Sequence, residues 1–444
     1  MKRTRHTGLV FLLLCSAVSS LSAFLLQKAT NTRIPDFRII YIGTRCLIEH
    51  RDPYSQAEFM QVFREQGGQL PHIPGQQHSL EDAVMSIVYL PSAFLLVAPF
   101  ATLAWGTAQM LWTISTICVF TIACCLMWTI ASEHSPVVSA CLLGIILANS
   151  EALFAFGNAA GVAVGLSTIA VWCFVRGRLG WLGVICLGIS VSLKPHDCVS
   201  ILILLIFARG NYRKRGVQTM LVAATLGTMA LLWIVQVSPH WLQELNSNVQ
   251  LVTSAGGIAD PGPTGASNGT GGYIISLQSV LALFRDDPHF YNAVTDILIL
   301  PFLLGWLIAT LRYRGLQSHF WLSLASLIPM SMLPVYHRSY DAKLLLLAVP
   351  GCALLWTKRG RKRWFALGAT LSAILLTSDI PGAVIVWLTN TFPKNPVGIA
   401  DKLLAVLLTR PATLALFFMT SFYVYEYWRQ SRDAAEARQI EVLS

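Results

Sequence analysis

The apolar stretch GLVFLLLCSAVSSLSAFLL, residues 8–26, decides the class of protein. It contains no charged residue, and a helix of this length covers most of the roughly 30 Å hydrocarbon core of a bilayer. We predict a first membrane-spanning helix over 8–27. A cleaved signal peptide is the alternative, but the apolar residues continue past the weak small-residue site at Ser20–Ser22, which favours a retained anchor. Comparable apolar runs recur along most of the chain, so the sequence predicts an all-α polytopic membrane protein.

The overall composition agrees with this class and excludes several others. Of the 444 residues 55% are hydrophobic and only 12% are charged, against about 25% charged in a typical soluble domain. The net charge of +10 is concentrated in short loops, which indicates membrane orientation and no nucleic-acid partner. Most of the 10 cysteines lie within apolar runs, where cysteine behaves as a small hydrophobic residue.

The basic loops predict how the chain crosses the membrane. Lysine and arginine accumulate on the cytoplasmic side of membrane proteins. This rule places both termini in the cytoplasm of a plasma-membrane protein, with outer loops at 28–82 and 238–292. The segments expected on the cytoplasmic side are Lys2–Arg5, 176–178, 209–215, 312–314, 358–363 and the tail 429–444. We predict one domain over 1–444 with about 12 spans.

In one part of this topology the number of apolar segments does not match the number of membrane crossings required. A second span, an inner turn and a third span are predicted at 83–103, Trp105-Gly106 and 107–131. The third span then ends outside at Ser132–His134, so an odd number of crossings must lead to Arg176. Two apolar segments follow instead, on either side of NSEALFAFGN (149–158). We expect one of the two to be re-entrant or broken, which membranes tolerate where backbone is buried in protein.

Two amphipathic helices are predicted in the first outer loop, where they would lie along the membrane surface. The first begins near Asp36, and the second begins with a capping box, Ser55 to Glu58, and ends at Gly67-Gly68. Asp52-Pro53-Tyr54 forms the turn between them. The apolar face of the first helix contains Phe37, Ile40, Tyr41, Thr44, Leu47 and Ile48.

Polar residues close to apolar segments are the candidate functional groups, because ionisable side chains at membrane depth are costly. Asp36 is either a helix N-cap or a functional carboxylate. Lys194-Pro195-His196 interrupts an apolar region between two short stretches, 181–193 and 198–208, so this turn is expected below the outer surface. A cation there suits an anionic lipid head group. For Lys194, phosphate binding and a structural role are equally supported interpretations.

The segment YHRSYD, residues 336–341, is the densest polar cluster beside the spans. Arg338 can bind phosphate through two hydrogen bonds, and His337 can relay a proton. An Arg338–Asp341 surface ion pair is the competing interpretation. Glu151 and Asn158 either bond each other across a helix break or line the cavity.

Six short motifs follow one another along the chain: D-F-x-x-x-Y from Asp36, D-P-Y from Asp52, Y-L-P-S from Tyr89, Gly157-Asn158, K-P-H from Lys194 and H-R-S-Y-D from His337. Their order resembles glycosyltransferase family 87, of the GT-C class of membrane enzymes. The resemblance extends over about 8–428, without any single specific motif. Two departures are His50-Arg51 before the Asp-Pro-Tyr turn, where the family usually has glycine, and Gly157-Asn158 where it has Gly-Gln.

The resemblance implies a GT-C-like bundle and an inverting transfer of mannose or another hexose or pentose. The donor would be a polyprenyl-phosphate sugar and the acceptor a lipid-linked or envelope glycan on the outer face. Asp36 occupies the place of the family's general base, His337 is a second catalytic candidate, and Lys194, Arg338 and His196 are candidates for binding the donor phosphate. We expect no cofactor and no metal, because the sequence has no close acidic pair. Further substrate-binding candidates are Tyr41, Arg45, Tyr54, Asn158, Tyr340 and Asp341.

Three alternatives stay open: a transporter or lipid flippase, a GT-C enzyme of another family, and an O-antigen ligase-like polymerase. A transporter often shows internal repeats, and none is evident. The charges also gather at one boundary of the membrane, which suits an enzyme supplied by lipid carriers.

Overall fold

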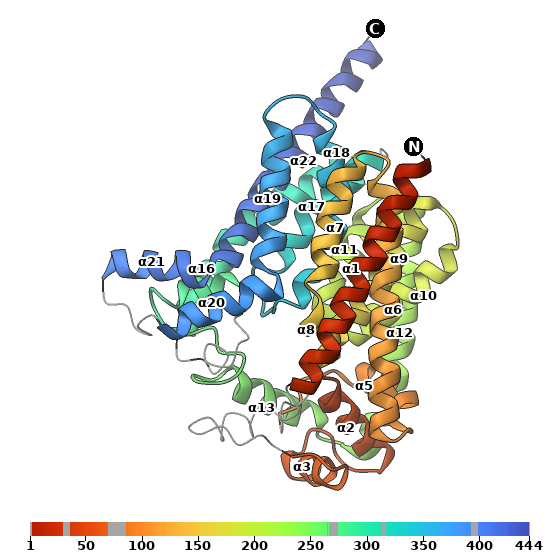
Figure 1. Ribbon diagram of the computed structural model, residues 1–444, viewed down its shortest axis with the longest axis vertical. Coiled ribbons are helices and arrows are strands. Elements are labelled where there is room, and N and C mark those ends of the chain that lie inside the picture. The colour runs from red at the N-terminus through yellow and green to blue at the C-terminus, as the bar shows by residue number, and fades with distance from the viewer. Residues whose placement is uncertain are drawn as a thin grey trace.

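The computed structural model is an all-helical bundle, which confirms the predicted fold class (Figure 1). It describes residues 2–29, 36–69, 86–263, 265, 274–312, 317–391 and 398–443. All regular structure in these residues is helical. Five helices among them are long and apolar enough to span a membrane, or seven if two bent pairs each count as one span. The total of about 12 spans therefore stays a prediction.

The five long apolar helices are α1 (Lys2–Ala29), α6 (Trp105–Ala131), α9 (Ala159–Arg176), α12 (Asn211–Val237) and α16 (Pro288–Arg312). Shorter apolar helices are α5 (Pro91–Ala101), α7 (Pro136–Ala148), α10 (Gly180–Leu193) and α11 (Pro195–Phe207). The other segments are α8 (Glu151–Phe156), α15 (Leu277–Leu281), α17 (Gln317–Ser331), η1 (Asp341–Ala348) and α18 (Val349–Trp356). Two bent pairs follow: α19 (Lys362–Leu376) with α20 (Asp379–Thr391), and α21 (Ile399–Thr409) with α22 (Pro411–Leu443).

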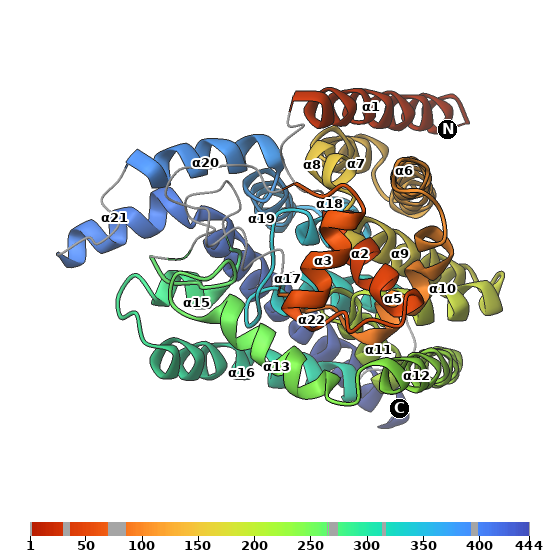
Figure 2. The same ribbon diagram turned by 90° about the horizontal axis from the view of Figure 1, so that it is seen from below.

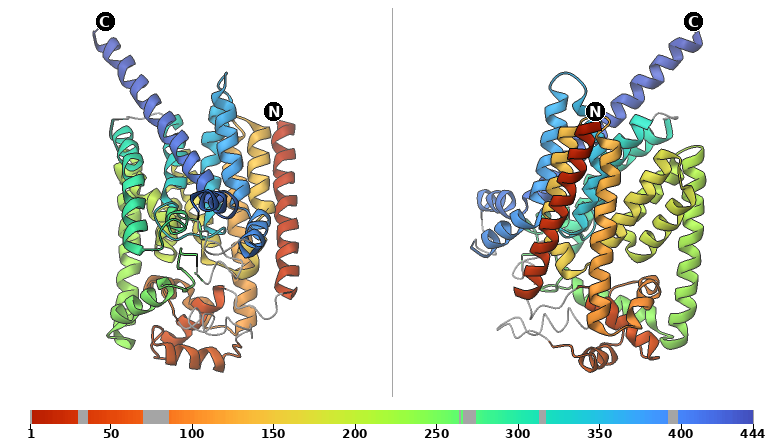
Figure 3. Two further views of the ribbon diagram at one scale, coloured as in Figure 1. Left: turned by 90° about the vertical axis from the view of Figure 1, so that its left-hand side faces the viewer. Right: turned by 45° about the vertical axis from the view of Figure 1, so that its right-hand side comes forward.

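The bundle has two distinct ends (Figures 1 and 3). The end with both chain termini is called the terminal end below. The opposite end, called the site end, is covered by α2 (Asp36–Ile48), α3 (Gln56–Glu65) and α13 (Trp241–Thr253), which lie across it (Figure 2). Helices α20 and α21 also run across the bundle axis, since their bent pairs turn by 68° and 81°. The predicted interfacial helices therefore form a layer over one end of the bundle.

Helix α2 is held in place by its aromatic residues. Phe37 stacks on Trp112 of α6, with ring centroids 4.6 Å apart and planes 9° apart. The Tyr41 hydroxyl donates to the Leu103 carbonyl at 2.8 Å. The face predicted from the sequence is buried, apart from the half-buried Ile48. Each Å² of apolar surface removed from water contributes about 25 cal/mol of favourable free energy, so this face is the main attachment of α2 to the bundle.

The start of α3 differs from the predicted capping box. Ser55 is the N-cap residue but makes no side-chain cap hydrogen bond. Glu58 instead accepts from the Asp52 backbone N–H at 2.7 Å, because the turn closed by Tyr54 N–H and Asp52 Oδ1 brings that N–H to it. The predicted end is confirmed, since Gly67 has a φ of +70° and the Gly68 N–H bonds to the Phe63 carbonyl.

The predicted second span is wrong. Helix α5 has 11 residues, a length of about 17 Å, and it packs against α2 at the site end. Its apolar surface is covered by α2 and α12 as well as by the bundle, so its hydropathy reflects burial in protein. The chain therefore enters α6 from the site end.

The predicted outer position of Ser132–His134 is wrong for the same reason. Glu133 forms a 2.7 Å ion pair with Arg176, a member of a predicted cytoplasmic loop, so both lie at the terminal end. Two crossings, α7 with α8 and then α9, connect these loops without a re-entrant segment. Helices α7 and α8 both pack on α1 and are interrupted at Asn149-Ser150, which confirms the broken segment.

Helices α10 and α11 form a hairpin that does not reach the site end. They have 14 and 13 residues, or about 20 Å each, against the roughly 30 Å of a bilayer core. Lys194 joins them and is buried. The turn thus lies below the level of the interfacial helices, as the short apolar stretches predicted.

The corrected topology is testable with epitope tags inserted into the full-length chain. Tags after His134 and after Gly177 should be protected or exposed together, because Glu133 and Arg176 pair at one end of the bundle. A tag after His240, beside α13, should show the opposite accessibility in intact cells. Opposite accessibility of the first two tags would restore the original second span.

Candidate functional site

A buried lysine is the centre of the candidate site. Lys194 follows α10, and Pro195 at the first position of α11 prevents one continuous helix. Its ammonium donates to the Asp341 carboxylate and, at 3.1 Å, to the Asn158 Oδ1 atom. The Asp197 carboxylate lies 3.4 Å away. A buried cation is tolerated only with such partners, so these contacts fix the ends of three helices around one point.

Asn158 connects this lysine to Asp36. Its amide nitrogen donates to Asp36 Oδ2 at 2.7 Å, across 122 positions of sequence. Its Oδ1 atom also caps α9 by accepting from the Ala160 N–H at 2.8 Å. Gly157 precedes it with a φ of +61°, and a Cβ there would come within 3.1 Å of Trp112. The backbone thus aims one amide group at both a carboxylate and an ammonium.

The loop before η1 completes the cluster. Asp341 accepts the Arg338 backbone N–H at 2.8 Å, while the Arg338 side chain bonds the Tyr336 hydroxyl and lies 5.5 Å from that ring. The ammonium of Lys194 lies 5.0 Å from the Tyr340 ring. The alternative of an Arg338–Asp341 surface pair is wrong, because Asp341 is buried and its carboxylate bonds Lys194.

The electrostatic setting of Asp36 favours a basic carboxylate. Burial raises its pKa above the ordinary value, and the hydrogen bond from Asn158 and the charges of Arg338 and Lys194 offset part of that increase. His337, in the loop before η1, has a lowered pKa, mainly because it is buried. Compared with exposed groups, the Asp36 carboxylate therefore binds a proton more readily and the His337 imidazole is neutral more readily.

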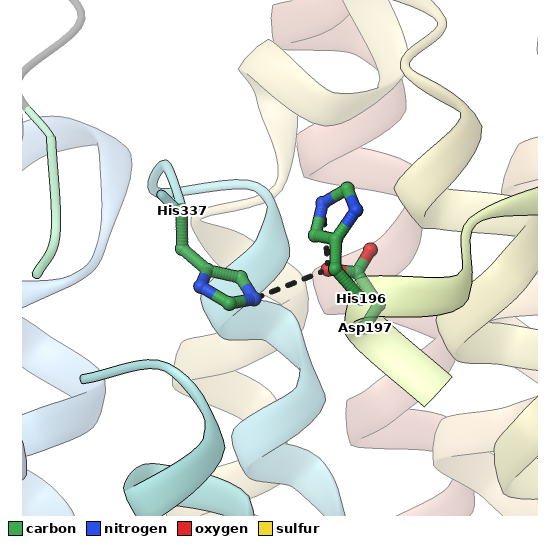
Figure 4. A group of neighbouring side chains, drawn as sticks. All are labelled: His196, Asp197 and His337. Atoms are coloured by element: carbon green, nitrogen blue, oxygen red, sulfur yellow. Dashed lines mark ion pairs between the residues drawn. The ribbon is translucent and has the colours of Figure 1, made fainter. Parts of the chain in front are cut away.

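A second group of side chains adjoins Lys194 (Figure 4). Asp197 Oδ1 lies 3.5 Å from His196 Nε2 and 3.6 Å from His337 Nε2. The imidazole rings lie 5.3 Å apart. Asp197 and His337 are buried, whereas 41% of the His196 side chain is exposed. The structure thus brings together His196, in the first turn of α11, and His337, in the loop before η1, 141 positions later.

Three predicted substrate-binding residues make other contacts. Tyr41 bonds the Leu103 carbonyl, Arg45 donates to the Ala101 carbonyl at 3.1 Å and pairs with Glu49 at 2.8 Å, and the Tyr54 hydroxyl donates to the Tyr89 carbonyl at 2.6 Å. These contacts attach α2 and α3 to α5 and its flanks, beside the cluster around Lys194 and not within it. A role in substrate binding stays a prediction for them.

Glu151 does not bond Asn158, whose amide is turned to Asp36. It lies instead beside a second buried pair, in which Lys343 is 3.4 Å from Asp379 and also bonds the Asn149 carbonyl. Asp379 accepts the Ala152 N–H at 2.9 Å. This pair holds the break between α7 and α8 and accounts for the polar residues there.

Sequence reasoning missed Asp197, Tyr336 and Tyr89 as members of the site. Tyr89 interacts electrostatically with Asp36 and Lys194. It precedes α5, and its only sequence signal was the Y-L-P-S motif. Asp197 directly follows the K-P-H motif, so the sequence placed it near Lys194 and His196. Nothing in the sequence indicated that Asp197 lies near His337 and Asp341.

The comparisons with known proteins identify one family. The model of glycosyltransferase family 87 matches residues 88–335, more than half of the chain. This range includes Asn158, Lys194 and Asp197, whereas Asp36 and Asp341 lie outside it. No match was found among curated proteins or solved structures.

The structural role of Lys194 is testable by its removal. Lys194→Ala leaves Asp341 and Asp197 buried without their cation, so the free energy of unfolding should fall by about 3–5 kcal/mol. Thermal melting in detergent measures the loss. Lys362→Ala is the control, because Lys362 is 39% exposed and its partner Glu426 keeps Arg429. Equal melting temperatures for the two variants would contradict the role of Lys194.

Proposed function

Because the chain belongs to glycosyltransferase family 87, we propose that it moves a sugar from a polyprenyl-phosphate carrier to a hydroxyl group of a lipid-linked or envelope glycan. Glycosyl transfer follows from the family, and the donor and acceptor classes are the proposal. Mannose or another hexose or pentose is the proposed sugar. Family membership also favours a transferase over a transporter or flippase.

One observation carries the mechanism: a single amide, Asn158, separates the Asp36 carboxylate from the Lys194 ammonium. Displacement at a sugar carbon needs a base on the side of the incoming hydroxyl and positive charge on the side of the leaving phosphate. The cluster offers both within one hydrogen-bonded chain. Arg338 adds a second cation that interacts electrostatically with Asp36.

In the proposed reaction, Asp36 accepts the proton of the acceptor hydroxyl as its oxygen bonds the anomeric carbon. The bond between that carbon and the phosphate oxygen breaks, and polyprenyl phosphate leaves with both electrons. A single displacement inverts the anomeric centre. A positioned base contributes roughly 10²–10⁴-fold to such a rate.

Lys194, Arg338 and His196 are the proposed contacts of the departing phosphate, with His337 beside them. Fixed cations in a water-poor site stabilise developing charge best, since they need no reorganisation during the reaction. Phosphate is already a good leaving group, so the transfer requires no organic cofactor. Tyr340 and Asp341 support the cations, through the ring of Tyr340 and the ion pair with Lys194.

The proposed location of the reaction is the outer face of the plasma membrane. The basic loops 176–178 and 358–363 favour a cytoplasmic terminal end. The site end would then face outward, where lipid-borne donors reach it from the bilayer.

The proposed base is tested by Asp36→Asn, which keeps the shape of the side chain and removes its basicity. Transfer of radiolabelled sugar from polyprenyl-phosphate mannose should fall at least about 100-fold. Binding of the donor should change little. Glu49→Gln, in the turn that follows α2, should retain activity, because Glu49 forms a partly exposed ion pair with Arg45. Near-normal turnover of folded Asp36→Asn protein would remove Asp36 from the mechanism.

A pH profile tests the environment of Asp36. The raised pKa predicts that kcat/KM falls with acidification at a higher pH than an exposed aspartate would give. Asn158→Ala removes a hydrogen bond that stabilises the charged carboxylate, so the acidic limb should move to still higher pH. Asn149→Ala is the control, since Lys343 contacts only the backbone carbonyl there. An acidic limb unmoved in Asn158→Ala would contradict the assignment.

A further inference from the structure

We propose that His196, Asp197 and His337 form a binding site for a divalent transition-metal ion of the Zn²⁺ type. The site stands on geometry alone. Its role beside the donor phosphate rests on the proposed function. The sequence predicted no metal because it has no close acidic pair, but these three ligands include two imidazoles.

The spacing of the ligand atoms suits one ion. His196 Nε2 and His337 Nε2 lie 3.5 and 3.6 Å from Asp197 Oδ1, and all three ligand atoms lie within 4.8 Å of one another. Ligands at about 2.0–2.1 Å from a zinc ion are themselves separated by roughly 3–3.5 Å. Small side-chain shifts therefore bring the three atoms to metal-binding distance.

The hydrogen bonding of His337 supplies an independent reason. Its Nδ1 atom lies 3.1 Å from the Val335 carbonyl, which can only accept, so Nδ1 carries the proton. A neutral imidazole then directs the Nε2 lone pair at Asp197 Oδ1, a second acceptor. Both atoms are buried without a hydrogen-bond donor among the described residues. Two facing acceptors need a proton or a metal ion between them, and a backbone carbonyl on Nδ1 is the usual partner of a metal-bound histidine.

The two carboxylate oxygens of Asp197 face different partners. Oδ2 lies 3.4 Å from the Lys194 ammonium, which leaves Oδ1 for the histidine side. Lys194 thereby orients the carboxylate without blocking the ligand position. The same carboxylate can hold a metal ion on one oxygen and an ammonium on the other.

The ligand set selects the kind of ion. Imidazole nitrogens suit zinc and neighbouring transition metals, whereas Mg²⁺ and Ca²⁺ prefer oxygen ligands. Three protein ligands leave a tetrahedral position open, as in catalytic zinc sites. The exposed side of His196 gives an ion access to the buried pair. In the proposed function, the open position receives a phosphate oxygen of the donor.

The test is metal binding by the full-length protein, purified in detergent and stripped with a chelator. Isothermal titration with Zn²⁺ and elemental analysis should show one ion per chain, and Co²⁺ should give the absorption spectrum of tetrahedral coordination. Asp197→Asn and His337→Gln should each weaken Zn²⁺ binding at least tenfold. His240→Gln, at an exposed histidine before α13, is the matched control and should bind normally.

Melting temperatures of the stripped variants establish that they are folded, and Zn²⁺ should raise that of wild type but not of Asp197→Asn. Absence of stoichiometric binding, or equal binding by Asp197→Asn, would overturn the inference and assign a proton to the space between His337 and Asp197. Failure of this metal site and failure of the proposed function give different results. Sugar transfer without ion binding would refute only the metal site, whereas ion binding without sugar transfer would refute only the proposed reaction.

Discussion

The buried ammonium of Lys194 is the constraint on which the rest of the site depends. A cation at membrane depth is costly unless carboxylates and hydrogen-bond acceptors surround it. Its partners here come from the start of α9, from α11 and from η1. These segments must meet for the lysine to be tolerated, so one charge determines where three helices begin or end.

The same constraint explains how an interfacial helix becomes part of a site. Asn158 bonds Lys194 with its carbonyl oxygen and Asp36 with its amide nitrogen, so the position of the lysine fixes the carboxylate. Stacking of Phe37 on Trp112 holds the first turn of α2 at that point. Aromatic packing of α2 and charge pairing around Lys194 therefore together place the Asp36 carboxylate one amide group away from the buried ammonium.

Local patterns predicted much of this arrangement. The 3.6-residue period of Phe37, Ile40 and Tyr41 predicted α2 and its buried face, and the proline after Lys194 predicted the interruption there. Hydropathy failed at 83–103, because burial of α5 under another helix produces the same apolar signal as burial in lipid. That error reversed the predicted side of Glu133. Pairings such as Asp36 with Asn158 follow from long-range packing, which no local pattern contains.

The proposed mechanism requires Asp36 to face the donor sugar from the side opposite a phosphate held by Lys194 and Arg338. The most direct measurement is a cryo-EM structure of the protein with a non-transferable polyprenyl-phosphate sugar. We expect the phosphate in contact with Lys194 or Arg338 and the anomeric carbon between the phosphate and Asp36, with room for a hydroxyl about 3 Å from the carboxylate. A phosphate bound elsewhere in the bundle, or Asp36 on the same side of the sugar as the phosphate, would contradict it.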